Sequence, residues 1–206
     1  MANIQNIIFD LGGVIINLDN QLTENAFTAL GVKNFRELFG HGHAASFFRE
    51  YEIGKINDRQ FLDNLKKLAQ IKVPDQAVID SFNIMLLDFP PERIALLREL
   101  RKRYRIFLFS NTNAMHLAAL QKIYDKTFPG ETLEDLFERT YYSNVLGMRK
   151  PDKESYDHIV AENHLDAGRT LFVDDALINV EGANAAGLKG FFLKPGTSLV
   201  DVDWNF

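Results

Sequence analysis

Polar residues gather at or shortly after the ends of short apolar runs in this 206-residue sequence. The four groups are, in chain order, Asp10, the pair Ser110 and Asn111, Lys150, and the pair Asp174 and Asp175. The apolar runs have the length of buried strands, and in an open parallel sheet the functional crevice lies beyond the carboxyl ends of the strands. We therefore expect three carboxylates, a hydroxyl, an amide and an ammonium to meet at one edge of a sheet.

The three carboxylates, Asp10, Asp174 and Asp175, would repel one another unless a cation lies close to them. Magnesium takes one or two carboxylates and leaves room for a phosphate oxygen, so Mg²⁺ is the predicted cofactor. A carboxylate can also attack phosphorus and form an aspartyl phosphate. Because the attacking group and the phosphate are both anionic, this reaction needs the positive charge of Mg²⁺ and Lys150, with help from the Ser110 hydroxyl.

Gly12 and Gly13 let the chain turn tightly after the first carboxylate, with N–H groups exposed to a bound anion. Taken alone, a glycine pair is more often an ordinary turn. Ser110 and Asn111 alone would more often belong to the start of the helix expected near Ala114. The position of both pairs after a buried strand favours the functional interpretation.

Five apolar runs indicate the strands that must position these residues. Four are clear and the last named here is weaker: Ile7–Phe9, Arg105–Phe109, Thr170–Val173, Gly190–Leu193 and Arg139–Ser143. Helical spacing of apolar residues fills the intervals, and strands that are apolar throughout are typical of a parallel sheet covered on both faces. The predicted fold class is α/β, with a Rossmann-like parallel sheet.

The long interval between the first strand and Arg105 contains no convincing strand and indicates helices. Their expected bounds are Gln21–Leu30, Asn34–Phe39, Ala45–Tyr51, Asp58–Gln70 and Pro74–Leu86, with Asp58 as the cap of the fourth and Pro74 at the start of the fifth. A helical insertion at this point would form a cap above the carboxyl edge of the sheet. We predict a core of residues 1–17 and 91–206 and a cap of residues 18–90.

The composition, 46% hydrophobic and 25% charged, predicts a packed globular protein and not a disordered one. A net charge of −5 without clustered Lys and Arg argues against a nucleic-acid partner. The absence of cysteine excludes disulfides and thiolate metal sites. No run approaches the ~20 apolar residues that cross a bilayer. We expect a cytoplasmic protein with no membrane partner, and either a monomer or a dimer.

Four segments carry a resemblance to a known family: "FDLGGV", "LFSN", "RKPDKESY" and "FVDDALINVEGANAAG". They stand in the order and context of the four motifs of the haloacid dehalogenase superfamily of phosphohydrolases, and the resemblance covers essentially the whole chain. The helical insertion resembles the small cap that this superfamily places after its first motif. Within it, "YEIGKINDRQFLDNL" resembles the branch that includes the α-D-glucose-1-phosphate phosphatases. Single motifs of this kind are weak, whereas all four in order are specific.

This resemblance implies metal-binding roles for four of the matched residues. Asp10 would be both the nucleophile and a metal ligand, and the carbonyl of Gly12 would be a second metal contact. Asp175 would bind the metal directly, and Asp174 would act directly or through water. These assignments repeat the Mg²⁺ site that the three carboxylates suggest on chemical grounds.

The resemblance also implies how a small phosphorylated substrate would be held. Ser110 and Asn111 would bind the phosphoryl group, together with the turn formed by Gly12 and Gly13. Lys150 would neutralise the charge of the nucleophile and of the phosphate, which makes it part of the catalytic machinery.

The sequence departs from the superfamily two residues after the nucleophile. Most of its phosphatases carry a second Asp there, which protonates the leaving alcohol, and this chain has Gly12. General acid–base help is typically worth ~10²–10⁴-fold in rate. An anomeric hydroxyl leaves more easily and needs this help less, and the sugar-1-phosphate branch shows the same replacement. Asp19, where the cap begins, is a hypothetical substitute.

The predicted function is Mg²⁺-dependent hydrolysis of a small phosphate monoester through a phosphorylated Asp10. Sugar phosphates are the leading substrate class, with a hexose 1-phosphate as the sharper prediction. The alternative is a catalytically weakened protein that binds a phosphorylated ligand or regulates, which Gly12 favours. A 2-haloacid dehalogenase would not need the Asp174–Asp175 pair in this form. A phosphomutase would usually keep the second Asp, and a response-regulator-like receiver would lack the large cap.

A second kind of metal site is suggested by His41 and His43, because histidine is a common ligand of transition metals. No further ligand has a clear spacing around them, so a polar loop of the cap is expected. His41, His43 or Arg49 could still contact the substrate, since residues of the cap face the crevice.

Overall fold

The structure is a computed structural model that describes residues 3–39 and 46–206 of the chain, so His41 and His43 lie outside the described residues. The core contains a sheet of five parallel strands in the order β3-β2-β1-β4-β5. The strands are β1 (Asn6–Phe9), β2 (Arg105–Ser110), β3 (Arg139–Tyr142), β4 (Thr170–Asp174) and β5 (Lys189–Phe192). The prediction of an α/β fold built on a parallel sheet is confirmed, and the weak signal at residues 139–143 is a real strand.

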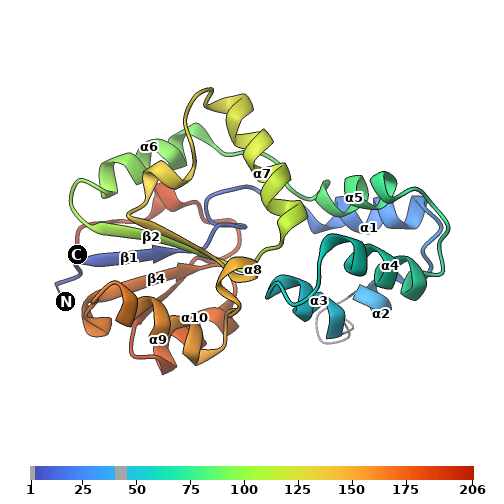
Figure 1. Cartoon of the computed structure of the whole chain (residues 1–206). Coiled ribbons are helices and arrows are strands. Elements are labelled where there is room, and N and C mark those ends of the chain that lie inside the picture. The colour runs from blue at the N-terminus through green and yellow to red at the C-terminus, as the bar shows by residue number, and fades with distance from the viewer. Residues whose placement is uncertain (1–2, 40–45) are drawn as a thin grey trace.

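Helices cover both faces of this sheet (Figure 1). Over one face lie α6 (Pro91–Leu100) and α7 (Ala114–Thr127), and over the other lie α9 (Lys153–Glu162) and α10 (Leu177–Ala185). Successive side chains of a strand point to opposite faces. Ile7 and Phe9 therefore enter one hydrophobic cluster and Ile8 enters the other, and all three are fully buried. This two-sided burial explains why β1 is apolar throughout.

The segment between β1 and β2 forms a second lobe beside the carboxyl ends of the strands (Figure 1). Its helices are α1 (Asn20–Ala29), α2 (Phe35–Phe39), α3 (Ser46–Glu52), α4 (Asp58–Ala69) and α5 (Asp75–Asn83). The lobe has a hydrophobic core of its own, in which the buried ring of Phe61 stacks on Tyr51 with centroids 4.2 Å apart. The division into a core of residues 1–17 and 91–206 and a cap of residues 18–90 stays a prediction.

Two chain segments connect the lobes, and their backbones pair with each other. The Leu87 N–H donates to Asn17 O at 3.0 Å, and the Asp19 N–H donates to Met85 O at 2.9 Å. This pairing explains why α5 ends at residue 83 and not at the predicted residue 86, because the backbone groups that follow are used in the connection. The cap is therefore joined to the core by a short two-stranded hinge.

The fourth predicted helix begins with a different capping residue from the one expected. Asn57 Oδ1 accepts from the Gln60 N–H, and Gln60 Oε1 accepts from the Asn57 N–H, both at 3.0 Å. This reciprocal pair is a capping box, which satisfies two backbone donors at once. The prediction that Asp58 is the cap was wrong by one residue, and Asp58 instead accepts from the Tyr51 hydroxyl at 2.6 Å.

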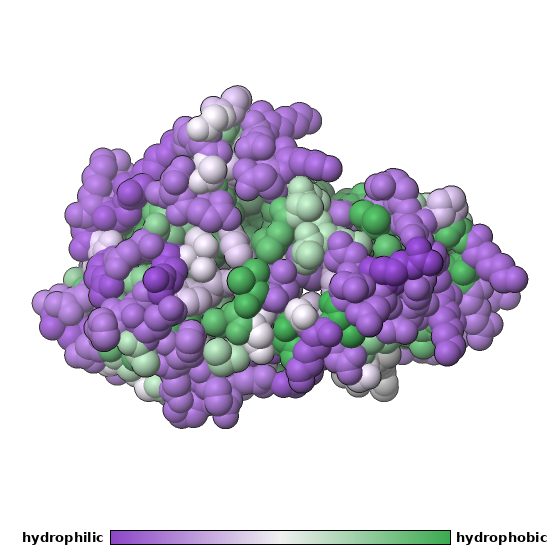
Figure 2. Space-filling model, viewed as in Figure 1, coloured by the Kyte–Doolittle hydropathy of each residue, from purple (hydrophilic) through white to green (hydrophobic). Residues whose placement is uncertain are grey.

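Hydrophilic side chains cover most of both lobes, and hydrophobic ones are visible in the hollow between them (Figure 2). Among residues 3–39 and 46–206, none of the helices combines the length and the apolar character that a membrane crossing requires. The hollow between the lobes is therefore the part of this surface where the candidate functional residues are expected.

Replacing Asn57 by alanine should lower the free energy of unfolding of the protein by ~1 kcal/mol, because the Asn57 side chain accepts the capping hydrogen bond from the Gln60 N–H. Urea unfolding followed by far-ultraviolet circular dichroism measures the change. Lys72→Ala, at an exposed position of the same lobe, is the matched control. Equal effects of the two substitutions would contradict a stabilising role for the capping box.

Candidate active site

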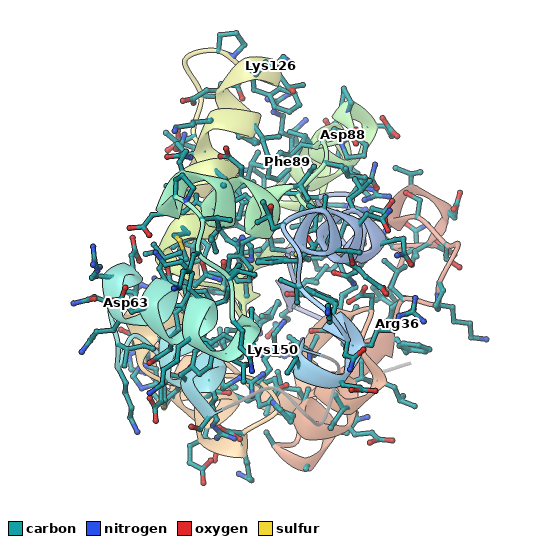
Figure 3. All side chains as sticks on the ribbon, turned by 90° about the vertical axis from the view of Figure 1, so that its right-hand side faces the viewer. Arg36, Asp63, Asp88, Phe89, Lys126 and Lys150 are labelled. Atoms are coloured by element: carbon teal, nitrogen blue, oxygen red, sulfur yellow. The ribbon has the colours of Figure 1, made fainter. Side chains whose placement is uncertain are left out.

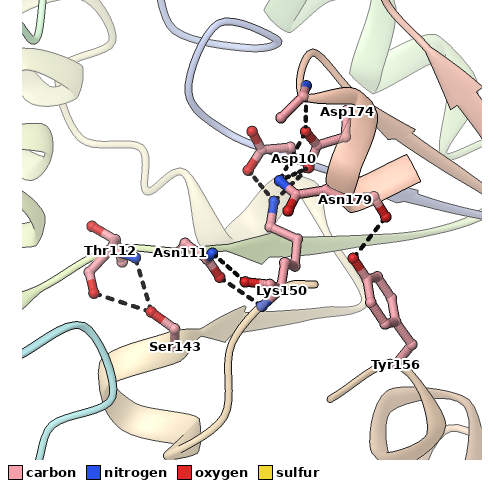
Figure 4. Close-up of polar contacts among 9 residues, drawn as sticks. Asp10, Asn111, Thr112, Ser143, Lys150, Tyr156, Asp174 and Asn179 are labelled. Carbon is pink, nitrogen blue, oxygen red and sulfur yellow. Dashed lines mark hydrogen bonds and ion pairs between the residues drawn. The ribbon is translucent and has the colours of Figure 1, made fainter. Parts of the chain in front are cut away.

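Lys150 is a buried ammonium group held between two carboxylates at the carboxyl edge of the sheet. Its Nζ lies 2.6 Å from Asp10 Oδ1 and 2.7 Å from Asp174 Oδ2 (Figure 4). The side chain of Lys150 is 1% exposed and that of Asp174 is completely buried. Because a buried charge is stable only with partners of opposite sign, these three groups depend on one another.

The order of the strands brings the two carboxylates together. Asp10 follows β1 and Asp174 ends β4, and these strands are neighbours in register, with Phe9 opposite Val173. The Asp10 N–H continues the ladder by donating to Val173 O at 2.9 Å. Both side chains therefore leave the sheet at the same edge, 164 positions apart in the sequence.

Two side-chain contacts position the loop that carries Lys150 (Figure 4). Asn111 Nδ2 donates to Lys150 O, and the Lys150 N–H donates to Asn111 Oδ1, both at 2.9 Å. Ser143 Oγ accepts from the Thr112 N–H at 2.9 Å and donates to Thr112 O at 3.1 Å, which joins the end of β2 to α8 (Ser143–Leu146). Sequence analysis missed Thr112 and Ser143, although both lie at the ends of expected strands.

Asp174 and Asp175 are adjacent in sequence but lie in different environments. Asp174 Oδ1 accepts from the Ala176 N–H at 2.8 Å, and Asn179 Nδ2 lies 3.1 Å from both oxygens of Asp174 (Figure 4). Asn179 is itself held where its carbonyl accepts from the Tyr156 hydroxyl at 2.8 Å. The oxygens of Asp174 are thus used within the protein, whereas Asp175 is exposed and lines the cavity described below.

The donor set fits a hard divalent cation. Carboxylate oxygens of Asp10, Asp174 and Asp175 lie within 4.8 Å of one another. A Cβ atom added to Gly13 would lie 2.1 Å from Asp175 Oδ2, and Gly13 has a φ of +71°, so only glycine lets the turn after β1 approach this carboxylate so closely. Oxygen ligands of this kind, with one of them exposed, suit Mg²⁺.

The site has an excess of negative charge over positive charge. Burial raises the pKa of Asp10 to about 7, Lys150 opposes this rise, and Asp174 adds to it. Burial lowers the pKa of Lys150, but the nearby carboxylates of Asp10 and Asp174 outweigh it, so the ammonium stays charged. Burial and Asp174 also raise the pKa of Asp175. A bound cation would stabilise the ionised forms of Asp10 and Asp175, which burial first and the Asp174 charge second make less favourable.

A cavity of about 540 Å³ lies between the two lobes and reaches this cluster. From the core it is lined by Asp10, Gly12, Ser110, Asn111, Lys150 and Asp175, and from the cap side by Phe48, Tyr51, Glu52, Phe82 and Met85. Viewed from the cap side in Figure 3, Lys150 lies behind the cap helices, toward the middle of the molecule. The structure thus brings these six core residues, all of them predicted from the sequence, to the wall of one cavity.

A larger side chain at the position two residues after Asp10 would require the end of the Leu18 side chain to shift. A Cβ atom on Gly12 would lie 2.8 Å from Leu18 Cδ1, a side chain of the hinge. Ser110, which ends β2, is 4% exposed and lines the cavity beside it. An acidic group that protonates a leaving alcohol must therefore come from elsewhere in the structure.

Asp19 is used as a helix cap. Its Oδ1 accepts from the Gln21 N–H at 2.9 Å at the start of α1. Asp19 is absent from the described residues that line the cavity. The hypothesis that Asp19 replaces the missing acid is therefore not supported by its position.

Ion pairs from α3 hold the cap against the loop that carries Lys150. Glu52 Oε2 lies 3.0 Å from Arg149 Nε, and Arg49 Nη2 lies 2.6 Å from Asp152 Oδ2. Arg49, which the sequence left as one possible substrate contact, pairs with Asp152 of the core. The sequence signal that could have identified Glu52 is its place in the "YEIGK" segment of the predicted cap.

His116 is a further cavity residue that sequence analysis did not identify. Its ring stacks on Phe82 with centroids 4.3 Å apart, and its Nδ1 lies 2.8 Å from Asn83 Oδ1. Burial lowers the pKa of His116 to about 4, so the ring is neutral near pH 7. A neutral ring with Nδ1 bonded to Asn83 can accept a hydrogen bond from a ligand at Nε2 without adding charge.

Comparisons with known proteins agree with this geometry. Residues 4–187 match the family of haloacid dehalogenase-like hydrolases. A D-ribitol-5-phosphate phosphatase of Bacteroides thetaiotaomicron is 31% identical over 98% of this chain and 95% of that protein. A sesquiterpene phosphatase of Aspergillus oryzae is 29% identical over 90% of this chain and 88% of that protein. The crystal structure of a wild-type HAD family enzyme of B. thetaiotaomicron, in complex with magnesium and inorganic phosphate, is 32% identical with a TM-score of 0.85, over 98% of both chains.

Asp174→Asn should lower the free energy of unfolding by about 3 kcal/mol, because it leaves Lys150 with one buried carboxylate in place of two. Asp175→Asn should leave this free energy nearly unchanged and weaken Mg²⁺ binding by at least ~10-fold, because Asp175 is an exposed ligand candidate. Urea unfolding and calorimetric titration with Mg²⁺ measure the two quantities. If the effects of the two substitutions were interchanged, this division of roles would be wrong.

His116→Gln should reduce the loss of stability on acidification. The folded-state pKa of about 4 lies below the unfolded value of 6.5, so the unfolded chain takes up a proton first as the pH falls. The neutral ring therefore contributes stability above pH 6.5, and this contribution is lost progressively toward pH 4. Unfolding free energies of the wild type and variant at pH 7 and pH 5 give the comparison, and identical pH slopes would exclude a buried neutral histidine.

Proposed function

This chain belongs to the haloacid dehalogenase-like hydrolase family, and from that premise we propose that it hydrolyses a small phosphate monoester with Mg²⁺ through a phosphorylated Asp10. The superfamily identified from the four motifs is confirmed, and so is the broader prediction of a phosphoric monoester hydrolase, since its relatives include named phosphatases. The observation that carries the proposal is the position of Lys150 between Asp10 and Asp174, beside the exposed Asp175 and at the floor of the cavity.

The residues of the site have separate parts in the proposed reaction. Asp10 attacks phosphorus, and Lys150 offsets the charge of the attacking carboxylate and of the phosphate. Ser110 donates a hydrogen bond to a phosphate oxygen. Because the side-chain amide of Asn111 is bonded to the backbone of Lys150, its contact with the phosphate would be made through the backbone N–H.

Three groups would hold the cation: the carboxylates of Asp10 and Asp175 and the carbonyl of Gly12. Bound there, Mg²⁺ would supply positive charge to the oxygens of the phosphate. Asp174 would act on the cation indirectly, since its oxygens accept from Ala176 and Asn179 and pair with Lys150. The close approach of Gly13 to Asp175 keeps the turn after β1 next to this cation position.

We propose sugar phosphates and related polyol phosphates as the substrate class. A cavity of about 540 Å³ suits a small molecule, and its walls combine polar groups, such as Tyr51 and His116, with apolar ones, such as Phe82. The hexose 1-phosphate predicted from the sequence and the 5-phosphate of a sugar alcohol, which the name of the relative at 31% identity suggests, are both members of this class. The assignment to the glucose-1-phosphate branch stays a prediction.

The two rival functions have less support. A protein that only binds a phosphorylated ligand would not require the Asp174–Asp175 pair together with Lys150. The glycine at position 12 still favours this alternative. A solved L-2-haloacid dehalogenase resembles this chain at 19% identity with a TM-score of 0.58, a likeness that concerns the fold alone.

Asp10→Asn should reduce Mg²⁺-dependent phosphate release by on the order of 10⁴-fold or more, because the amide cannot act as the nucleophile. The assay uses hexose 1-phosphates, pentitol 5-phosphates and p-nitrophenyl phosphate, with and without a chelator. Asp63→Asn, a carboxylate at the outer side of α4, is the matched control (Figure 3). Release that is unaffected by Asp10→Asn would contradict the phospho-aspartate mechanism, and turnover of 2-chloropropionate without metal would favour the dehalogenase.

A further inference from the structure

The reaction proposed above needs a proton donor that the turn after β1 does not supply. When the bond between phosphorus and an alkyl oxygen breaks, the leaving alkoxide is strongly basic and must be protonated. Gly12 has no side chain to do this, and the Leu18 side chain occupies the adjacent space. The donor must therefore be another titratable group on the wall of the cavity.

Most titratable groups of the cavity wall are unsuited to this task. The described ones are Asp10, Tyr51, Glu52, His116, Lys150 and Asp175. Asp10, Lys150 and Asp175 belong to the charged cluster that binds phosphate and cation. The Tyr51 hydroxyl donates its proton to Asp58 Oδ1 at 2.6 Å and accepts from the Met115 N–H at 3.3 Å, so its proton is directed away from the cavity.

His116 does not carry a proton that it could donate to the leaving oxygen. Its Nδ1 faces the acceptor Asn83 Oδ1 at 2.8 Å, so in the neutral ring the proton is on Nδ1 and Nε2 is an acceptor. Burial holds the pKa of His116 at about 4, which keeps the ring neutral near pH 7. His116 can accept a hydrogen bond from a substrate hydroxyl, but it cannot act as the acid.

The remaining group is Glu52, the last residue of α3 in the cap. Resting on the proposed function, we infer that Glu52, a residue of the cap, is the general acid and base of the reaction. It takes the place of the acidic side chain that is absent at position 12 of the core. Its side chain is 34% exposed and lines the cavity, with Oε2 3.0 Å from Arg149 Nε. Arg149 immediately precedes Lys150, so the pair joins the end of α3 to the loop of Lys150, and Glu52 lines the same cavity as Asp10 and Lys150.

The surroundings of the Glu52 carboxyl group are compatible with both its protonated and its ionised form. Burial raises the pKa of Glu52, and Arg149 and Arg49 oppose this rise. Arg49 is itself paired with Asp152 at 2.6 Å, so Arg149 is the positive charge nearest to the carboxylate that forms when the proton leaves. A group with these opposing influences can lose a proton in one step and regain it in the next.

The proton balance closes over two steps. In the first, Asp10 forms a bond to phosphorus, the bond from phosphorus to the alkyl oxygen breaks, and the Glu52 carboxyl group gives its proton to that oxygen. In the second, water attacks phosphorus, the Glu52 carboxylate takes a proton from this water, and the bond between Asp10 and phosphorus breaks. Phosphate and an alcohol are the products, and both carboxyl groups return to their starting states.

This assignment makes the acid depend on closure of the cap. A Cβ atom on Gly54 would lie 2.2 Å from Asn144 O, so the turn after α3 packs directly on α8 of the core. Together with the Glu52–Arg149 and Arg49–Asp152 pairs, this contact sets the end of α3 against the loop of Lys150. Opening at the hinge would withdraw Glu52 and leave the nucleophile in place.

The test is Glu52→Gln, assayed with an alkyl phosphate and with p-nitrophenyl phosphate in Mg²⁺. The nitrophenolate leaves without protonation, so its first-step rate should change less than about fivefold, measured as the pre-steady-state release of nitrophenolate. Single-turnover cleavage of the alkyl ester should fall by ~10²-fold or more. The nitrophenolate burst also shows that the variant is folded and that its Asp10 is active.

Two further variants complete the experiment. Arg149→Gln keeps the carboxyl group and removes the charge that lowers its pKa, so the alkaline limb of the alkyl-ester pH profile should move to higher pH. His116→Gln should not produce a loss that depends on the leaving group. Equal losses on both esters in Glu52→Gln, or a leaving-group dependence in His116→Gln, would overturn the assignment. A wild-type protein inactive on both esters would instead refute the proposed function.

Discussion

A buried ammonium group between two carboxylates is the constraint on which this structure depends. Lys150, Asp10 and Asp174 come from three distant parts of the chain, and none of them is stable at this depth without the others. The sheet satisfies this requirement because β1 and β4 are neighbours, and because Asn111 holds the backbone of Lys150 at the end of β2. The contacts that stabilise the core therefore also set the geometry of the proposed active site.

The charge balance of this cluster explains its chemistry. Three carboxylates surround one ammonium group, and the least buried of the three, Asp175, faces the cavity. The excess of negative charge favours a divalent cation, and the cation and Lys150 together make the site attractive to a phosphate dianion. Asp174, whose oxygens are bonded within the protein, fixes the lysine, while Asp175 is left for the metal.

The two lobes contribute different residues to the proposed site. In the proposed reaction the core supplies the nucleophile and the phosphate contacts, and the cap supplies Tyr51, Glu52 and Phe82 to the opposite wall of the cavity. The hinge at residues 17–19 and 85–88 is short, and its two segments are paired through backbone hydrogen bonds. Leu18 of this hinge lies next to Gly12, the position that lacks an acidic side chain. The hinge and the site therefore meet at Gly12.

The sequence by itself determined the parallel α/β fold and the residues at its carboxyl edge, because apolar strands that end in polar residues have few other solutions. Only the tertiary structure decided the different environments of Asp174 and Asp175, since adjacent residues of a strand end point in different directions. It also decided the positions of Asp19 and Glu52. A lone carboxylate in a helical segment carries no local signal that distinguishes a helix cap from a cavity residue, and that difference arises only when the cap packs against the core.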